Sequence, residues 1–518
     1  MSDSTPSIPE ALNQAVTRYG DQPAILFADR TVSLAEVDAA ADRVAAALAA
    51  RGVVKGDRVA LYCINTDSFA FAYLGIQKAG AVVVPVNLLF NPREIDYILN
   101  DAGVKGLIYH AAMAESVKSF APQIRSLQFA CCIGGEPATA RHEHFDDWLA
   151  GQGSVPAVSF DTAEDLAAIL YTSGTTGHPK GAMLTHRNLV SNTRSVASAL
   201  QLEPGRDRLL VVLPMFHSFA ATVGLLTPLL HGLALAPVPK FEPGLVSDVI
   251  GAVGATVFLG VPSMYNVILR LPEEQSAKWR TVRFGVSGGA AMPVELMRRF
   301  EARFGFPILE GDGPTECSPV TCVNPLDGER KPASVGLPVP DVAMAIFDDA
   351  GARLPTGGIG EICVRGPNVM KGYWHLPEAT AETFFGDWVR TGDLGYIDAD
   401  GYVFMVDRKK DMIIVNGMNV YPRMVEEVLF QHPDVLEAAV VGEPHESHGE
   451  IPVAHVVLRE GATLDAAAVR AWCREHLGRH EVPRKVVLRE SLPKNATGKV
   501  LKRELRKEGE LERGVDSR

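Results

Sequence analysis

An eleven-residue stretch, Tyr171–Gly181, combines hydroxyls, glycines and a lysine in a pattern suited to binding phosphate groups. Glycines let backbone N–H groups turn towards an anion without obstruction from a Cβ atom, and a lysine adds a mobile positive charge. A Walker A loop is excluded, because two residues separate Gly177 from Lys180. A surface loop rich in Ser, Thr and Gly is the alternative interpretation. The expected phosphate-binding residues are Thr172, Ser173, Gly174, Thr175, Thr176, Gly177 and Lys180.

Two acidic residues and a second lysine follow further along the chain. Glu316 closes Asp312-Gly-Pro-Thr-Glu316, where a carboxylate suits a hard cation beside phosphate oxygens. Asp393 closes Val-Arg-Thr-Gly-Asp and could accept both hydroxyls of a ribose. Lys499 closes Pro-Lys-Asn-Ala-Thr-Gly-Lys, which taken alone is typical of an exposed loop.

Strand and helix signals alternate along the chain and must position these residues. The apolar run Leu166–Leu170 predicts a buried strand before the phosphate loop, and Ala182–Leu189 after it is compatible with a helix. Near the N-terminus, Ser33 and Glu36 form a capping box in front of an amphipathic helix. This alternation predicts an α/β fold with largely parallel, helix-covered sheets, and the last hundred or so residues predict a compact α+β domain.

Composition limits the protein class. A chain of 518 residues should divide into at least two domains, and a net charge of −12 argues against nucleic-acid binding. Seven cysteines without scaffold spacing predict reduced thiols, and no secretion signal is visible, so a cytoplasmic location is expected. Leu209–Pro239 carries no charged residue and is long enough to cross a bilayer, but its prolines and glycines favour a buried strand, helix and strand instead.

The phosphate loop closely resembles that of the AMP-forming acyl-CoA synthetases, which belong to a superfamily with peptide-synthetase adenylation domains and beetle luciferases. The other motifs follow in the family's order over nearly the whole chain. Asp312 is the one departure, because it stands where the family has a tyrosine that stacks on adenine. No adenine role is therefore assigned to Asp312.

The resemblance implies roles for individual residues. Glu316 would hold Mg²⁺, His217 would border the acyl pocket, and Lys499 would be the catalytic lysine that bridges carboxylate and α-phosphate. Lys410 would be the hinge between a large N-terminal domain, residues 1–407, and a small mobile C-terminal domain, residues 408–518. The remaining nucleotide or coenzyme A contacts would be Gly289, Ala290 and Ala291 at adenine, Thr315 at phosphate, Asp393 and Arg408 at ribose, and Gly417 near the pantetheine thiol.

The implied reaction is ATP-dependent adenylation of a carboxylic acid, followed by transfer of the acyl group to coenzyme A. Peptide-synthetase domains carry an aspartate that pairs with a substrate amine, but no carboxylate occurs from Met215 to Ala221, so an apolar acid, foremost a fatty acid, is favoured. Three alternatives stay open: loading of a carrier-protein thiol, a non-catalytic nucleotide- or acyl-binding protein, and a luciferase-like oxygenase. A homodimer and peripheral membrane contact also stay open.

Overall fold

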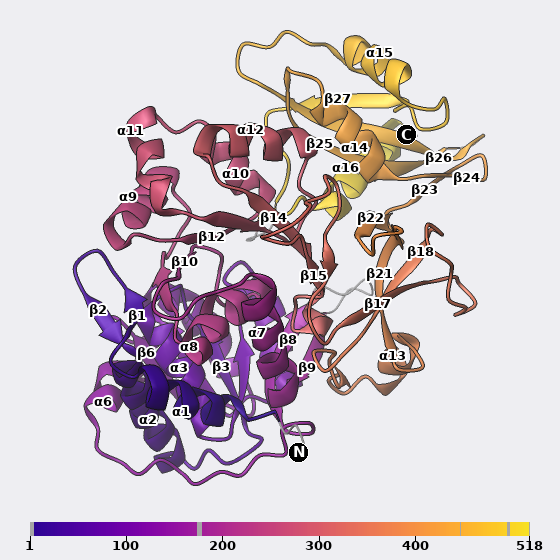
Figure 1. The fold of residues 1–518 in the computed structure, drawn as a ribbon. Helices are drawn as coiled ribbons and strands as arrows, with labels where there is room; N and C mark the ends of the chain where they lie inside the picture. The colour runs from indigo at the N-terminus through magenta and orange to yellow at the C-terminus, as the bar shows by residue number, and fades with distance from the viewer. Residues whose placement is uncertain (1–4, 173–178, 446, 495–497, 517–518) are drawn as a thin grey trace.

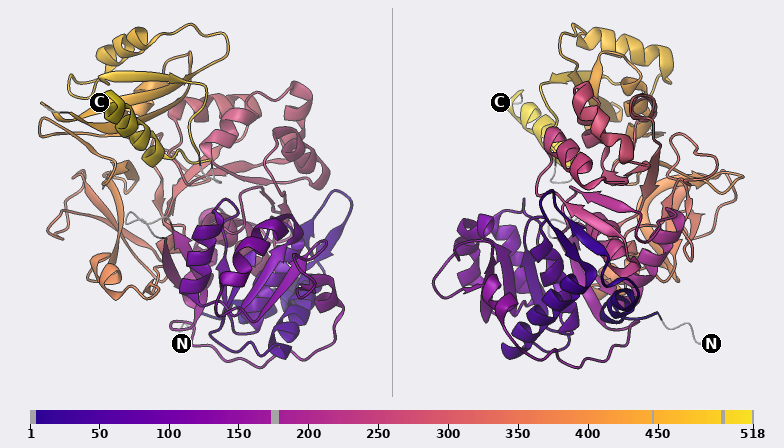
Figure 2. Two further views of the ribbon diagram at one scale, coloured as in Figure 1. Left: turned by 180° about the vertical axis from the view of Figure 1, so that it is seen from behind. Right: turned by 60° about the vertical axis from the view of Figure 1, so that its left-hand side comes forward.

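The structure, a computed structural model, describes residues 5–172, 179–445, 447–494 and 498–516. Two large sheets and one smaller sheet form the N-terminal part of the chain, and a fourth sheet forms a separate C-terminal part (Figure 1). Views from behind and from the side show the C-terminal part stacked on one end of the N-terminal part (Figure 2). The predicted fold class, a large α/β domain with a smaller C-terminal domain, is confirmed; the boundary at residue 407 stays a prediction.

The first large sheet carries the phosphate loop. Its central strands are parallel and buried, and helices α2 (Leu34–Ala50) and α3 (Asp67–Lys78) pack against each other beside it. The Ser33 side chain caps α2 together with Glu36, as the capping box predicts. In spatial order the strands are β19 (Gly372–Tyr373), β9 (Lys180–Thr185), β8 (Leu166–Thr172), β4 (Val82–Pro85), β3 (Arg58–Tyr62), β5 (Gly106–His110), β6 (Phe129–Ile133) and β7 (Glu143–His144).

The second large sheet contains Asp312, the first residue of the motif that Glu316 closes. The uncharged span after residue 208 forms strand, π-helix η3 (Ala220–Leu226), α8 (Thr227–His231) and strand, buried inside the N-terminal part. No helix in the described ranges is long and apolar enough to span a membrane. The strands run β16 (Leu337–Pro338), β15 (Cys322–Val323), β14 (Ile308–Asp312), β13 (Phe284–Ser287), β12 (Val257–Gly260), β10 (Arg208–Val211), β11 (Ala234–Pro237), β1 (Pro23–Leu26) and β2 (Thr31–Ser33).

Two five-stranded sheets complete the fold. The third comprises β17 (Ala343–Phe347), β18 (Gly360–Arg365), β20 (Phe384–Phe385), β21 (Trp388–Ile397) and β22 (Val403–Arg408). The C-terminal sheet comprises β23 (Ile413–Val415), β24 (Met418–Val420), β25 (Val435–His445), β26 (Gly449–Leu458) and β27 (Lys485–Arg489), with helices α14 (Pro422–Phe430), α15 (Ala466–His476) and α16 (Lys502–Asp516). Residues such as Val425, Val440 and Val456 give this part an apolar core of its own.

The remaining helices cover the N-terminal sheets or connect their strands. They are α1 (Ile8–Tyr19), α4 (Pro92–Ala102), α5 (Ala114–Phe120), α6 (Phe145–Ala150), α7 (His186–Ala199), α9 (Pro243–Val253), α10 (Pro262–Ile268), α11 (Glu273–Ser276), α12 (Val294–Phe304) and α13 (Pro377–Glu382).

The helix expected over Ala182–Leu189 is wrong in its first half. β9 runs antiparallel to β8 with Thr172 opposite Lys180, and α7 begins only at His186. The apolar residues after the phosphate loop are needed to complete the sheet, and the Thr185 side chain then caps the helix. Short apolar runs do not distinguish a buried strand from a buried helix.

Candidate active site

The phosphate loop is the connection of the β8–β9 hairpin. The Thr172 hydroxyl donates to the Lys180 carbonyl oxygen at 3.5 Å, across the two ends of the loop. The hydroxyl of Tyr171 donates to Asp101 Oδ2 at 2.5 Å, which ties the end of β8 to α4. Both ends of the loop are thus held by ordered strands. The predicted phosphate residues Ser173, Gly174, Thr175, Thr176 and Gly177 lie outside the described residues.

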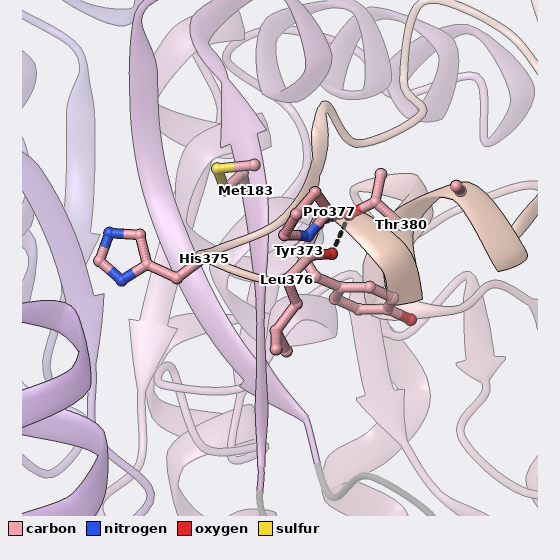
Figure 3. A pocket seen from close by; sticks show the side chains of 7 residues that line it. Met183, Tyr373, His375, Leu376, Pro377 and Thr380 are labelled. Atoms are coloured by element: carbon pink, nitrogen blue, oxygen red, sulfur yellow. Dashed lines mark hydrogen bonds between the residues drawn. The ribbon is translucent and has the colours of Figure 1, made fainter.

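Tyr373, which sequence reasoning missed, lies between Lys180 and Glu316. The Lys180 ammonium is 5.1 Å from the centroid of the Tyr373 ring, and the Tyr373 hydroxyl donates to Glu316 Oε1 at 2.8 Å. The Tyr373 backbone N–H donates to Thr380 Oγ1 at 2.8 Å, and Figure 3 shows the Tyr373 and His375 side chains extending in opposite directions. The tyrosine thereby orients the Glu316 carboxylate. No spacing signal pointed to it, because β19 joins β9 only in the folded sheet.

The turn after β14 brings Thr315 beside the segment that precedes η3. The Thr315 and Ser218 hydroxyls are 3.1 Å apart. Only glycine fits at position 313, because a Cβ atom there would lie 1.6 Å from the Pro319 carbonyl oxygen. His217 is on the same segment, and burial, together with the positive charge of Lys499, lowers its pKa to about 4. A neutral imidazole therefore borders this part of the site.

Four charged side chains converge where the two parts of the chain meet. β21 and β22 place Asp393 opposite Arg408, with Arg408 Nε 3.1 Å from Asp393 Oδ1. Burial and the nearby Asp393 raise the pKa of Asp312 to about 6. Burial and the positive charge of Arg408 lower the pKa of Lys499 to about 8, while Asp393 and Asp312 oppose that shift. The predicted ribose and catalytic residues are thus close enough to interact electrostatically.

The predicted adenine residues follow β13 in a turn. Gly289 has φ +76°, a left-handed conformation that glycine adopts without strain, and Ala290 and Ala291 are half-buried. The ring of Phe219 packs against the preceding residue, where a Cβ atom on Gly288 would lie 3.3 Å from Phe219 Cε1. This turn therefore lies against Phe219, the residue just before η3.

Lys499 and Gly417 differ in their position relative to the site. A Cβ atom on Gly498 would lie 2.5 Å from Ser263 Oγ at the start of α10, so the backbone before Lys499 is docked on the N-terminal part. Gly417 is exposed in the turn of the β23–β24 hairpin, with nothing within 4 Å of a Cβ atom built there, and the hairpin projects from the C-terminal part (Figure 1). The structure brings Lys499 into the site and leaves Gly417 outside it. The exposed Lys410 lies between the two parts.

Known proteins resemble this chain in both sequence and structure. The sequence matches the AMP-binding enzyme family over residues 12–374 and the AMP-binding enzyme C-terminal domain over residues 424–499. A long-chain-fatty-acid–CoA ligase of Salmonella typhimurium is 37% identical, covering 98% of this chain and 95% of that protein. A sulfoacetate–CoA ligase of Cupriavidus necator is 36% identical over 93% of this chain and 94% of its own length. ATP-bound MatB from Rhodopseudomonas palustris is 36% identical, with a TM-score of 0.88 over 96% of this chain and 98% of that one.

The chain therefore belongs to the AMP-binding enzyme family. Within that family it is an AMP-forming acyl-CoA synthetase, an acid–thiol ligase whose substrates are ATP, a carboxylic acid and coenzyme A.

Replacing Asp312 with tyrosine is expected to lower the KM for ATP. The resemblance implies a tyrosine that stacks on adenine at this position, and base stacking contributes roughly 1–3 kcal/mol in comparable contacts. The Asp312→Asn variant is the control, because it removes the charge beside Asp393 without adding a ring. Pyrophosphate exchange at graded ATP concentrations measures both variants. An equal change in the two would show that charge, not stacking, controls nucleotide affinity here.

Proposed function

We propose that this acyl-CoA synthetase acts on an apolar carboxylic acid, foremost a fatty acid. The observation that carries the proposal is the burial and neutrality of η3: every residue from Ala220 to Leu226 is buried, and none is charged. A charged substrate tail beside this segment would lose its hydration without gaining a partner, whereas an alkyl chain would lose nothing. The 37% identity to a long-chain-fatty-acid–CoA ligase supports the same substrate class, although a sulfoacetate–CoA ligase is nearly as similar.

The reaction would proceed in two steps at one site. A carboxylate oxygen of the acid attacks the α-phosphorus of ATP, the bond to pyrophosphate breaks, and acyl-AMP forms. The coenzyme A thiol, after losing its proton, then attacks the acyl carbonyl and releases AMP. Lys499 would stabilise the negative charge that develops at the α-phosphate, Lys180 would bind the departing phosphates, and Asp393 with Arg408 would hold the ribose.

Glu316 fits the expected Mg²⁺ ligand. Its carboxylate has one oxygen oriented by Tyr373, and it adjoins Thr315, which the resemblance assigns to phosphate. Among the residues that the structure describes, no group of three or more His, Cys, Asp and Glu side chains could hold a metal ion. A single carboxylate suits Mg²⁺ in this setting, because Mg²⁺ takes its other ligands from substrate phosphates and water. When bound, the ion would neutralise charge on the triphosphate.

Two orientations of the C-terminal part would serve the two steps. Lys499 lies in the site in the described orientation, and Gly417 could approach the acyl carbonyl only after a rotation about Lys410. We further propose a cytoplasmic location, with which the seven free, buried cysteines agree.

A coenzyme A ligation screen across acids of graded length and charge tests the substrate class. We expect kcat/KM to rise with alkyl chain length, since each buried methylene adds about 0.8 kcal/mol. Sulfoacetate and short dicarboxylic acids are expected to be poor substrates. A charged short acid as the best substrate would refute the proposal, and acyl-AMP formation without transfer to free coenzyme A would indicate a carrier-protein acceptor instead.

A further inference from the structure

Arg423, in the first turn of α14, reaches from the C-terminal part into the N-terminal part. Its Nη1 donates to the Met405 carbonyl oxygen on β22 at 2.8 Å, and its Nη2 lies 3.9 Å from Glu310 Oε1 on β14. Its backbone N–H donates to Asp407 Oδ2 at 2.8 Å. Asp407 thereby caps α14, because the N-cap residue of that helix, Tyr421, provides no side-chain hydrogen bond. The Arg423 side chain is 10% exposed and that of Glu310 is 1% exposed.

Glu310 and a second acidic residue of this interface hold the turn that contains the predicted adenine residues. Glu310 Oε1 accepts a hydrogen bond from the backbone N–H of Met292 at 2.9 Å. Glu427, one helical turn after Arg423 on the same face of α14, interacts with the backbone N–H of Val294, the first residue of α12. The end of the turn between β13 and α12 is therefore held by two carboxylates, and Arg423 stabilises the charged form of each.

The buried Glu310 and Arg423 depend on each other. In the described part of the chain, Glu310 Oε2 and Arg423 Nη2 have no hydrogen-bond partner. Arg423 Nη2 lies 3.9 Å from the other carboxylate oxygen, Glu310 Oε1, and the guanidinium also attracts the Glu427 carboxylate. Burial raises the pKa of Glu310 to about 7, and Arg423 opposes the shift. Removing Arg423 would raise the pKa of Glu310 further and favour its neutral form, which accepts the Met292 hydrogen bond less strongly than the carboxylate does.

We propose that Arg423 is a positioning residue that couples the orientation of the C-terminal part to the nucleotide-binding turn at residues 288–293. β14 and β22 belong to the N-terminal part and α14 to the C-terminal part, so a rotation about Lys410 separates Arg423 from Glu310 and Met405 together. The turn is then held fully only in the orientation that brings Lys499 into the site. This inference rests on the proposed alternation between two orientations.

The test measures the two half-reactions separately in the full-length Arg423→Gln variant. Adenylation, followed by pyrophosphate exchange, is expected to fall at least tenfold with a raised KM for ATP, because both the turn and the docked orientation are weakened. Conversion of supplied acyl-AMP and coenzyme A to thioester is expected to stay within about twofold of wild type, because the rotated orientation does not use Arg423. Arg423→Lys keeps a positive charge and should restore part of the adenylation rate.

Three further variants complete the design. Arg489→Gln removes two contacts inside the C-terminal part: an ion pair with Glu508 at 2.5 Å and the hydrogen bond that Nε donates to His455 Nδ1 at 2.8 Å. It should leave both half-reactions unchanged. Glu310→Gln should impair adenylation, and the Glu310→Gln/Arg423→Gln double variant should lose less than the product of the single losses, because the two residues share one interaction.

Equal loss of both half-reactions in Arg423→Gln and Arg423→Lys, unchanged adenylation in Arg423→Gln, or fully multiplicative losses would overturn the proposal. Failure of the wild type to adenylate any acid would refute the proposed function instead.

Discussion

Replacing Lys499 with alanine is expected to slow acyl-AMP formation by about 10²–10³, the usual effect of removing one preorganised contact to a developing charge. The negative charges of Asp393 and Asp312 act on the Lys499 ammonium, and the backbone before it is docked against Ser263 of the N-terminal part. Conversion of supplied acyl-AMP to the thioester should continue, because Lys499 would leave the site for that step. Pyrophosphate exchange and single-turnover thioester formation measure the two steps separately.

Lys494→Ala provides the matched control for this prediction. Lys494 lies five residues before Lys499, and its ammonium pairs with Glu437 at 2.5 Å within the C-terminal part. We expect neither half-reaction to change in this variant. Equal loss of both steps in Lys499→Ala would contradict both the catalytic role of the lysine and the alternating orientations.

The pH dependence of adenylation should report the same lysine. A lysine is charged below its pKa, and the pKa of Lys499 is lowered to about 8 by burial and by Arg408. The kcat/KM for ATP, which reports the free enzyme, should therefore fall as pH rises through about 8. Lys499→Arg should move that decline to higher pH, because an arginine stays charged. A decline at the same pH in this variant would assign the titration to another group.

Replacing Glu316 with glutamine is expected to lower adenylation by about 10² or more at ordinary Mg²⁺ concentrations. The amide keeps the shape of the side chain but removes the charge that would hold the cation beside the triphosphate. Part of the loss should be recovered at higher Mg²⁺, since the defect lies in metal affinity. Adenylation rates measured over a Mg²⁺ titration show this shift directly.

Tyr373→Phe refines the prediction for Glu316. The variant removes the hydroxyl that donates to Glu316 Oε1 but retains the ring beside Lys180. Loss of a residue that orients a metal ligand typically costs about 10–100-fold in metal affinity, so Tyr373→Phe should need more Mg²⁺, though less than Glu316→Gln. Glu164→Gln, which alters an exposed pair with Lys371, is the control and should behave as wild type. A normal Mg²⁺ titration in Glu316→Gln would show that Glu316 is not a ligand.

Much of the fold and the list of candidate residues could be predicted from the sequence alone. Capping residues such as Ser33 act on neighbours within one turn, and helical or strand periodicity repeats over a few residues, so both leave local patterns. The order of the motifs indicated the enzyme class, and the family comparison confirms it. The functions of the individual residues stay predictions, as does the domain boundary at residue 407.

Tertiary structure alone decided how these residues meet. β9 is a strand because β8 lies beside it, and Tyr373 reaches Glu316 because β19 joins the edge of that sheet. Arg423 reaches Glu310 because α14 packs against β22. The second and third contacts join residues 57 and 113 positions apart, and sequence spacing carries no information about which surfaces will pack together. Periodicity and motifs therefore determined the fold class and the candidate chemistry of this protein. Packing between sheets and between its two parts determined which side chains orient the candidate residues.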